Sequence, residues 1–186
     1  MEHFYQDIQG WFDFEDIYSE MVASAANGAN FVEIGSWKGK SSAYMAVEIA
    51  NSNKDIKFYC VDTWLGSIEH AGFGEVMDDS LYNIFLDNMK PAAGYFQAVR
   101  MRSVEAASVI RDGFFDFIFI DASHEYSDVA ADLESWYPKL KTGGVLAGHD
   151  YEPRWESVIA AADDFAKNKN LKVSKTSNIC FRLDKL

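Results

Sequence analysis

Polar side chains that could perform acid–base chemistry follow two apolar segments of this chain. Asp121 and His124 come after one apolar run, and His149 and Asp150 come after another. Such runs suit strands of a sheet that is covered on both faces. If the two strands are parallel neighbours, their carboxyl ends meet at one edge, where open α/β sheets bind ligands. Two carboxylates and two imidazoles at one edge exceed what packing requires, so the spacing predicts a functional site.

A glycine turn lies in the segment 31–42, which reads FVEIGSWKGKSS. An apolar run containing Glu33 passes through Gly35 and Gly39 and opens into a helical pattern, which is typical of a strand leading into a helix around a nucleotide-like ligand. Gly35 permits the tight turn, and Gly39 would let the backbone approach the ligand. The spacing is one residue short for a phosphate-binding loop, and Trp37 breaks the dinucleotide pattern G-x-G-x-x-G. A glycine-rich turn without a ligand is the alternative.

A further acidic residue, Asp62, ends the next apolar run and is followed by Thr63. An acidic residue about 20 positions beyond the glycines accepts hydrogen bonds from ribose hydroxyls in nucleotide-binding sheets. An ordinary turn residue is the alternative, because Asp favours such positions. Arg102 and Ser103 follow a weaker third strand, and Ser103 is expected to cap the next helix.

The elements that must position these residues alternate along the chain. Strand patterns occupy residues 31–35, 57–62, 96–101, 116–121, 145–149, 171–175 and 178–184, and helical patterns occupy 13–27, 41–52, 103–111, 126–140 and 153–168. This alternation predicts an α/β fold with a doubly wound, mostly parallel, Rossmann-like sheet of seven strands. The last two strand patterns are separated by a short turn, so one terminal strand is expected to be antiparallel.

One domain is expected over residues 1–186, which is enough chain to bury a full core. Residues 1–28 are expected to form an N-terminal helical cover. Residues 64–94 are longer than a usual connection, and we expect a helix and a flexible cover, or lid, over the site. Aromatic residues near the N-terminus either cover a substrate pocket or contact a second subunit, with core packing for at least half of them: Phe4, Tyr5, Trp11, Phe12 and Phe14.

Composition excludes several classes of partner. The net charge is −12, and Lys and Arg are not clustered as a nucleic-acid-binding surface requires, so no nucleic acid is expected. No apolar run reaches the ~18 residues of a membrane helix, and the N-terminus lacks the pattern of a signal peptide. A cytoplasmic protein is expected, with Cys60 and Cys180 as buried free thiols. The sequence leaves a homo-oligomer open.

Together these motifs resemble class I S-adenosylmethionine (SAM) methyltransferases. Glu33–Gly39 matches the E-x-G-x-x-x-G pattern of that family. Ile120–Leu133 reads I-D-x-x-H-x-Y-x-x-V-x-x-D-L, and Leu140–Tyr151 reads L-x-x-G-G-x-L-x-G-H-D-Y. Both are similar to a subgroup that includes sugar and macrolide O-methyltransferases and cephalosporin-hydroxylase-like relatives. The resemblance covers roughly residues 30–151.

The resemblance implies SAM as cofactor and a role for each matching residue. The glycine turn would line the methionine end, with Glu33 orienting the amino group; Asp62 would hold the ribose, and Ser103 would lie near the adenine. The implied cofactor-binding residues are Glu33, Gly35, Ser36, Gly39, Asp62, Thr63, Arg102, Ser103 and Asp121.

Several members of the wider group hold a divalent metal with the Asp after strand four and an acidic pair after strand five. Carried over, Asp121 and Asp150 would be metal ligands, and Mg²⁺ would suit their oxygen atoms. His149 is the third candidate ligand, but it stands where the metal-dependent members have a carboxylate, and imidazole is a poor Mg²⁺ ligand. A metal-free site, in which His149 and Asp150 place the substrate, therefore stays open.

The predicted reaction is SAM-dependent methyl transfer to a hydroxyl of a small metabolite or sugar. A hydroxyl keeps its proton at neutral pH, so it needs a base or a metal; His124 is the predicted base, beside Asp121, because an unperturbed His titrates near ~6.5. A structural role for His124 is the alternative. A metal-independent enzyme with another acceptor, a nucleotide- or NAD-binding protein, and a SAM-binding protein without catalysis also remain open.

Overall fold

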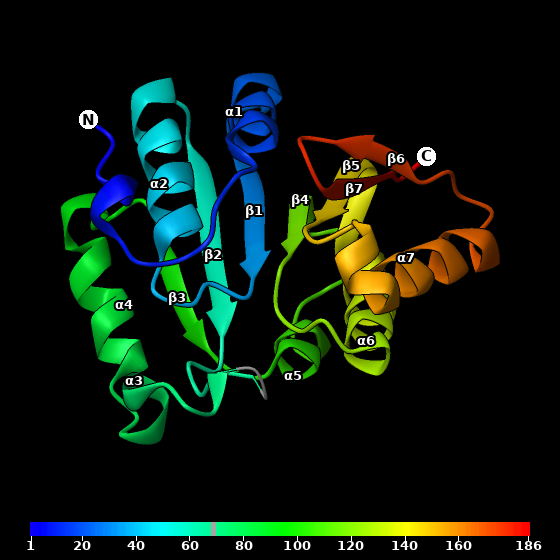
Figure 1. Cartoon of the computed structure of the whole chain (residues 1–186). Coiled ribbons are helices and arrows are strands. Elements are labelled where there is room, and N and C mark those ends of the chain that lie inside the picture. The colour runs from blue at the N-terminus through cyan, green and yellow to red at the C-terminus, as the bar shows by residue number, and fades with distance from the viewer. Residues whose placement is uncertain (68–69) are drawn as a thin grey trace.

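Seven strands form one mixed sheet in the computed structural model, which describes residues 1–67 and 70–186 (Figure 1). The strand order is β3-β2-β1-β4-β5-β7-β6. The strands are β1 Ala29–Ile34, β2 Ile56–Asp62, β3 Gln97–Arg100, β4 Phe115–Ile120, β5 Leu140–Gly148, β6 Ser174–Thr176 and β7 Cys180–Asp184. Pairs among β1 to β5 are parallel, and β7 is antiparallel to both β5 and β6. The predicted fold class is confirmed, including the antiparallel final strand.

Helices alternate with the strands as the sequence predicts. They are α1 Glu15–Ser24, α2 Lys40–Ser52, α3 Gly74–Met77, α4 Leu81–Met89, α5 Ser103–Ser108, α6 Tyr126–Trp136 and α7 Glu156–Asn168. The largest boundary difference follows α6, for which the sequence pattern predicts an end at residue 140. The helix ends at Trp136 because Pro138 follows, and a 3-10 helix then leads directly into β5, which begins five residues earlier than expected.

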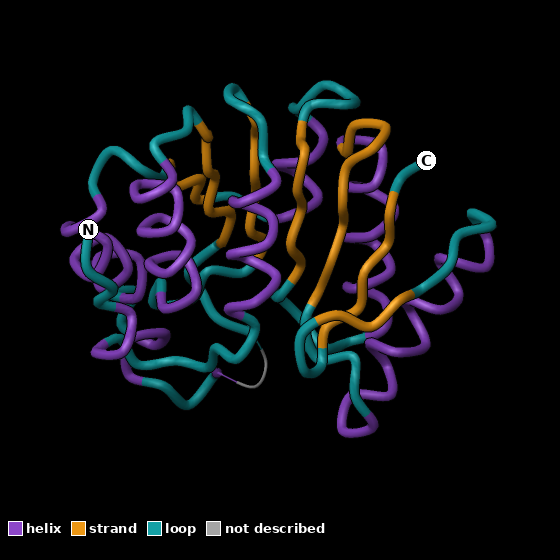
Figure 2. Tube along the Cα trace, turned by 90° about the horizontal axis from the view of Figure 1, so that it is seen from above, coloured by secondary structure: helices purple, strands orange, loops and turns teal. Residues whose placement is uncertain are grey.

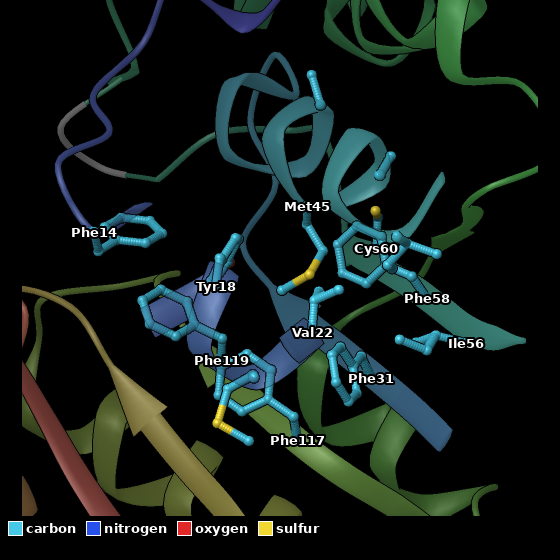
Figure 3. Packing of buried hydrophobic residues seen from close by; sticks show 14 of the residues in the cluster. Phe14, Tyr18, Val22, Phe31, Met45, Ile56, Phe58, Cys60, Phe117 and Phe119 are labelled. Atoms are coloured by element: carbon cyan, nitrogen blue, oxygen red, sulfur yellow. The ribbon is translucent and has the colours of Figure 1, made fainter. Parts of the chain in front are cut away.

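The core lies on both faces of the sheet, because successive strand residues point to opposite sides. Phe31 of β1 and Phe117 and Phe119 of β4 pack in the cluster covered by α1, α2 and α4 (Figure 3). Val32 and Ile118 belong to the second cluster, on the side of α5, α6 and α7. Figure 2 shows these helices and strands from above. Each fully buried Phe contributes about 1.5–3 kcal/mol, so both layers hold the strand ends in place.

The N-terminal segment before α1 runs along α2. His3 Nε2 lies 3.1 Å from Glu48 Oε1, and Lys40 Nζ donates to the Ile8 carbonyl at 3.1 Å. Phe14 is fully buried, whereas Trp11 is 64% exposed. The aromatic residues of this segment therefore divide between core packing and surface.

The segment 64–94 contains the helix expected there, α4, which is part of the body of the protein, whereas the cover over the site stays a prediction. Leu81, Phe85 and Met89 recur every four residues along α4, and all three are fully buried. Such spacing places them on one helix face, which packs into the core. The residues available for covering the site lie before α4; residues 68–69, which fall there, lie outside the described residues.

Across the two described ranges, no helix combines the length and apolarity needed to cross a bilayer. Cys60 and Cys180 are buried free thiols, as expected.

Candidate functional site

The glycine turn brings the ends of β1 and β4 into contact. Gly35 has φ +89°, and a Cβ there would overlap the backbone carbonyl of Asp121. The Gly35 N–H donates a hydrogen bond to the Val61 carbonyl at 2.9 Å, and the Asp121 N–H donates one to the Ile34 carbonyl at 2.8 Å. The tight-turn role predicted for Gly35 is therefore confirmed, and Asp121 lies directly against the turn.

Gly39 has a packing role in addition to the ligand-binding role predicted for it. It also has φ +89° and precedes α2, but a Cβ there would approach Phe85 and Met89 at 3.1 and 3.2 Å. The space left by its missing side chain faces α4. Gly39 thus allows α2 and α4 to pack closely, and its approach to a ligand stays a prediction.

Asp62 at the end of β2 organises the turn. Its Oδ2 accepts hydrogen bonds from the backbone N–H groups of Ser36 and Trp37 at 2.9 Å each, and its Oδ1 accepts one from the backbone N–H of Trp64 at 2.8 Å. Burial raises the pKa of the Asp62 carboxyl, and these N–H donors oppose the rise. The Thr63 N–H also lowers the pKa of Asp62, so backbone N–H groups take up most of the acceptor positions of this carboxylate. Asp62 therefore shapes the turn, and its bond to a ribose hydroxyl stays a prediction.

Glu33 lies beneath the turn. It is 1% exposed, and its carboxylate accepts hydrogen bonds from the hydroxyl groups of Tyr18 at 2.8 Å, Ser36 at 2.8 Å, and Ser42. Burial raises the pKa of the Glu33 carboxyl, and the hydroxyl donors oppose the rise. These bonds let Glu33 support the turn from beneath through Ser36. Its part in orienting the SAM amino group, which the resemblance implies, stays a prediction.

The two residues expected to bind the cofactor after the third strand, Arg102 and Ser103, differ in their surroundings. The Arg102 side chain is exposed. Ser103 is the first residue of α5, and its hydroxyl donates to Asp132 and accepts from Trp136 Nε1 at 2.8 Å, so it ties α5 to α6 and does not cap the helix. Thr63 Oγ1 accepts the Leu65 N–H at 3.2 Å, at the same edge as Asp62.

The structure brings together the four polar residues predicted at the ends of β4 and β5. These strands are neighbours, with Ile120 opposite Gly148. His124 Nε2 lies 2.6 Å from Asp150 Oδ2. His149 Nδ1 lies 3.2 Å from the same oxygen and 3.5 Å from Asp121 Oδ1.

The charges of this cluster are coupled. Burial opposes ionisation of Asp150, but hydrogen bonds from His124 and His149 hold its pKa well below the usual range. Burial likewise opposes the charge on His149, but its bonds to Asp121 and Asp150 outweigh this and raise its pKa to about 11. At neutral pH the cluster therefore holds an anionic Asp150 beside a protonated His149.

Two residues of this site were not singled out by the sequence, although both lie in segments (1–15 and 151–156) that it predicts around the acceptor pocket. Asp13 Oδ1 lies 2.9 Å from His149 Nε2, across 136 positions of the chain. The Trp155 ring stacks on the His124 ring, with centroids 3.9 Å apart and planes at 13°. Neither residue follows an apolar strand pattern, so neither could be assigned to the sheet edge from the sequence.

The same edge can hold a divalent metal. Asp121, His124 and Asp150 each offer one ligand atom, and these atoms lie within 4.8 Å of one another. His124 completes this set of three, whereas the sequence named His149 as the third candidate. His149 Nδ1 faces the same two carboxylates, and its Nε2 faces Asp13. Two carboxylates and one imidazole fit a divalent ion, and they suit Mn²⁺ or Zn²⁺ as well as Mg²⁺.

Comparison with known proteins identifies the family and the fold. The family model described as a methyltransferase domain matches residues 32–151. The uncharacterized protein y4gI of Sinorhizobium fredii is 29% identical over 152 residues, which are 82% of this chain and 16% of that protein. This chain thus spans less than a fifth of the length of that relative.

Solved structures share the fold at low identity. The O-methyltransferase NovP superposes with a TM-score of 0.72 at 13% identity, over 92% of this chain and 78% of that chain. A SAM-dependent methyltransferase from Aquifex aeolicus gives 0.62 at 16% identity, over 92% and 88%. Fibrillarin of Aeropyrum pernix, with natively bound SAM, gives 0.57 at 9% identity, over 85% and 67%.

The family match covers most of the chain and includes the glycine turn and the ends of β4 and β5. The resemblance predicted from the sequence motifs is confirmed. This chain belongs to the methyltransferase-domain family and has the class I fold of SAM-dependent methyltransferases.

Proposed function

We propose that this chain transfers the methyl group of SAM to a hydroxyl of a small metabolite or sugar. The observation that carries the proposal is the convergence of Asp121, His124 and Asp150 beside the Gly35 turn. A proton acceptor thus lies next to the turn that, in this family, approaches the cofactor. The net charge of −12 favours a small acceptor over a nucleic acid.

The protein's part in this reaction is alignment and proton removal. SAM supplies the methyl group as a ready-made electrophile when it is bound. Asp62 would accept a hydrogen bond from the ribose, and the turn that it holds would fix the approach of the cofactor. His124 takes the proton of the acceptor hydroxyl, and Asp150 stabilises the resulting imidazolium, as a carboxylate does for a catalytic histidine.

A metal-assisted form of the same reaction is favoured by the ligand set. Asp121, His124 and Asp150 would hold the ion, which would lower the pKa of the acceptor hydroxyl. In this form His124 is a ligand and does not act as the base. EDTA treatment separates the two: turnover that survives complete removal of metal assigns proton removal to His124.

Cofactor identity is tested by differential scanning fluorimetry with S-adenosylhomocysteine and, separately, with NAD. We expect stabilisation by S-adenosylhomocysteine alone. A ligand that binds only the folded state, present at a concentration 100 times its Kd, raises the free energy of unfolding by about 2.7 kcal/mol. Stabilisation by NAD alone would contradict the proposal. Methyl transfer is then measured with tritiated SAM against a panel of hydroxylated sugars and aromatic metabolites. Cofactor binding without turnover on any of them would favour a non-catalytic SAM-binding protein.

A further inference from the structure

Asp13 reaches the site from a segment that the sheet-edge pattern does not include. It precedes α1, and its Oδ1 lies 2.9 Å from His149 Nε2. The His149 side chain is 9% exposed, whereas that of Asp13 is 48% exposed. The contact therefore closes the solvent side of a largely buried ring.

The backbone around Asp13 is held from two directions. The Asp13 carbonyl accepts Asn178 Nδ2 at 2.9 Å, in the turn between β6 and β7. The neighbouring Phe14 is fully buried and stacks on Phe119 of β4, with ring centroids 4.5 Å apart. In the same turn, Ser177 Oγ accepts the Ile17 N–H at 3.1 Å. The N-terminal segment and the final hairpin thus fix the Asp13 carboxylate over the sheet edge.

His149 consequently has a carboxylate at each end of its ring. Its Nε2 faces Asp13, and its Nδ1 faces Asp121 and Asp150. The bond made by one ring nitrogen determines the orientation and role of the other. Without the outer bond, the ring could rotate and withdraw Nδ1 from the two inner carboxylates.

We propose that Asp13 is a positioning residue, which holds the His149 ring so that Nδ1 bridges Asp121 and Asp150. The N-terminal segment is then part of the methyl-transfer site as well as a cover for α2. The effect on turnover rests on the proposed function, whereas the effect on the ring can be measured without any reaction.

The test compares Asp13→Asn, which keeps the shape but removes the charge, with Asp13→Glu. Asp16→Asn is the matched control, because Asp16 is an exposed carboxylate three residues away in the first turn of α1. Long-range ¹H–¹⁵N spectra give the chemical shifts of the histidine ring nitrogens, which depend on the hydrogen bonds of each ring. The His149→Gln variant identifies the His149 signals among those of the four histidines.

We expect Asp13→Asn to shift both ring-nitrogen signals of His149 and to lower kcat about 10–100-fold, with KM for SAM unchanged within twofold. Asp13→Glu should restore part of the turnover, and Asp16→Asn should match the parent protein. Unchanged His149 signals in Asp13→Asn would overturn the inference, and so would unchanged kcat. If the signals shift while the parent protein transfers no methyl group, the proposed function fails and the positioning of the ring by Asp13 stands.

Discussion

His124 is held by a different element on each side. Asp150 bonds its Nε2 at 2.6 Å, Trp155 stacks on its ring, and Ser157 Oγ donates to its backbone carbonyl. A group held this firmly loses little freedom when a substrate arrives, which is what alignment of a proton acceptor requires. Its side chain is nevertheless 18% exposed, so it stays within reach of an acceptor.

Replacement of His124 by Gln tests this residue. We expect turnover to fall about 10²–10⁴-fold, the usual contribution of a general acid–base group. Affinity for S-adenosylhomocysteine, measured by calorimetry, should stay within twofold, because the proposed cofactor site is built around the turn and Asp62. Full turnover in the His124→Gln variant would remove His124 from the mechanism.

The turn between β1 and α2 is the element on which the site depends, and its geometry rests on one glycine. Gly35 combines a left-handed backbone with contact against the Asp121 carbonyl. Gly94 offers a comparison, because it has φ +96° and a Cβ there would meet no atom of the described residues within 4 Å. The two positions separate backbone strain from steric overlap.

Gly94→Ala should therefore cost only the strain of a left-handed alanine, about 1–2 kcal/mol. Gly35→Ala should cost at least about 2 kcal/mol more, because the turn must move away from β4. Urea unfolding measures both free energies, and calorimetry should show weaker S-adenosylhomocysteine binding for Gly35→Ala alone. Equal losses in the two variants would show that the turn does not need this close contact.

At the scale of the whole molecule, a buried charge links stability to pH. Asp132 of α6 is 5% exposed, and its hydroxyl donor is Ser103. Burial raises the pKa of the Asp132 carboxyl to about 6, against the lowering effect of that bond. Because the folded pKa exceeds the unfolded one, the folded state binds more protons, and this group lowers stability as pH rises from about 4 to 6.

Asp132→Asn should remove this penalty while keeping an acceptor for Ser103. We expect it to raise the free energy of unfolding by about 1–3 kcal/mol at pH 8, from a pKa difference of roughly two units. At pH 4 the two proteins should unfold at the same urea concentration. A stability difference that does not depend on pH would show that Asp132 carries no charge-dependent penalty.

The sequence by itself determined the order of elements, the fold class and the sheet edge that carries the polar cluster. These depend on local patterns: apolar runs, glycine spacing and the residues directly after each strand. Side-chain direction within a strand follows the same logic, since Glu33 shares a face with the buried Phe31. Its burial could have been predicted from that alternation, although the motif resemblance pointed to the cofactor.

Only the tertiary structure decided which groups complete the site. Asp13 meets His149 because the N-terminal segment and the final hairpin pack together over the sheet edge. Neighbouring helices likewise decide that Gly39 packs against α4 and that the Ser103 hydroxyl bonds to Asp132 of α6. Such contacts join segments far apart in the chain, so no local spacing encodes them; they arise when both layers of helices close on the sheet.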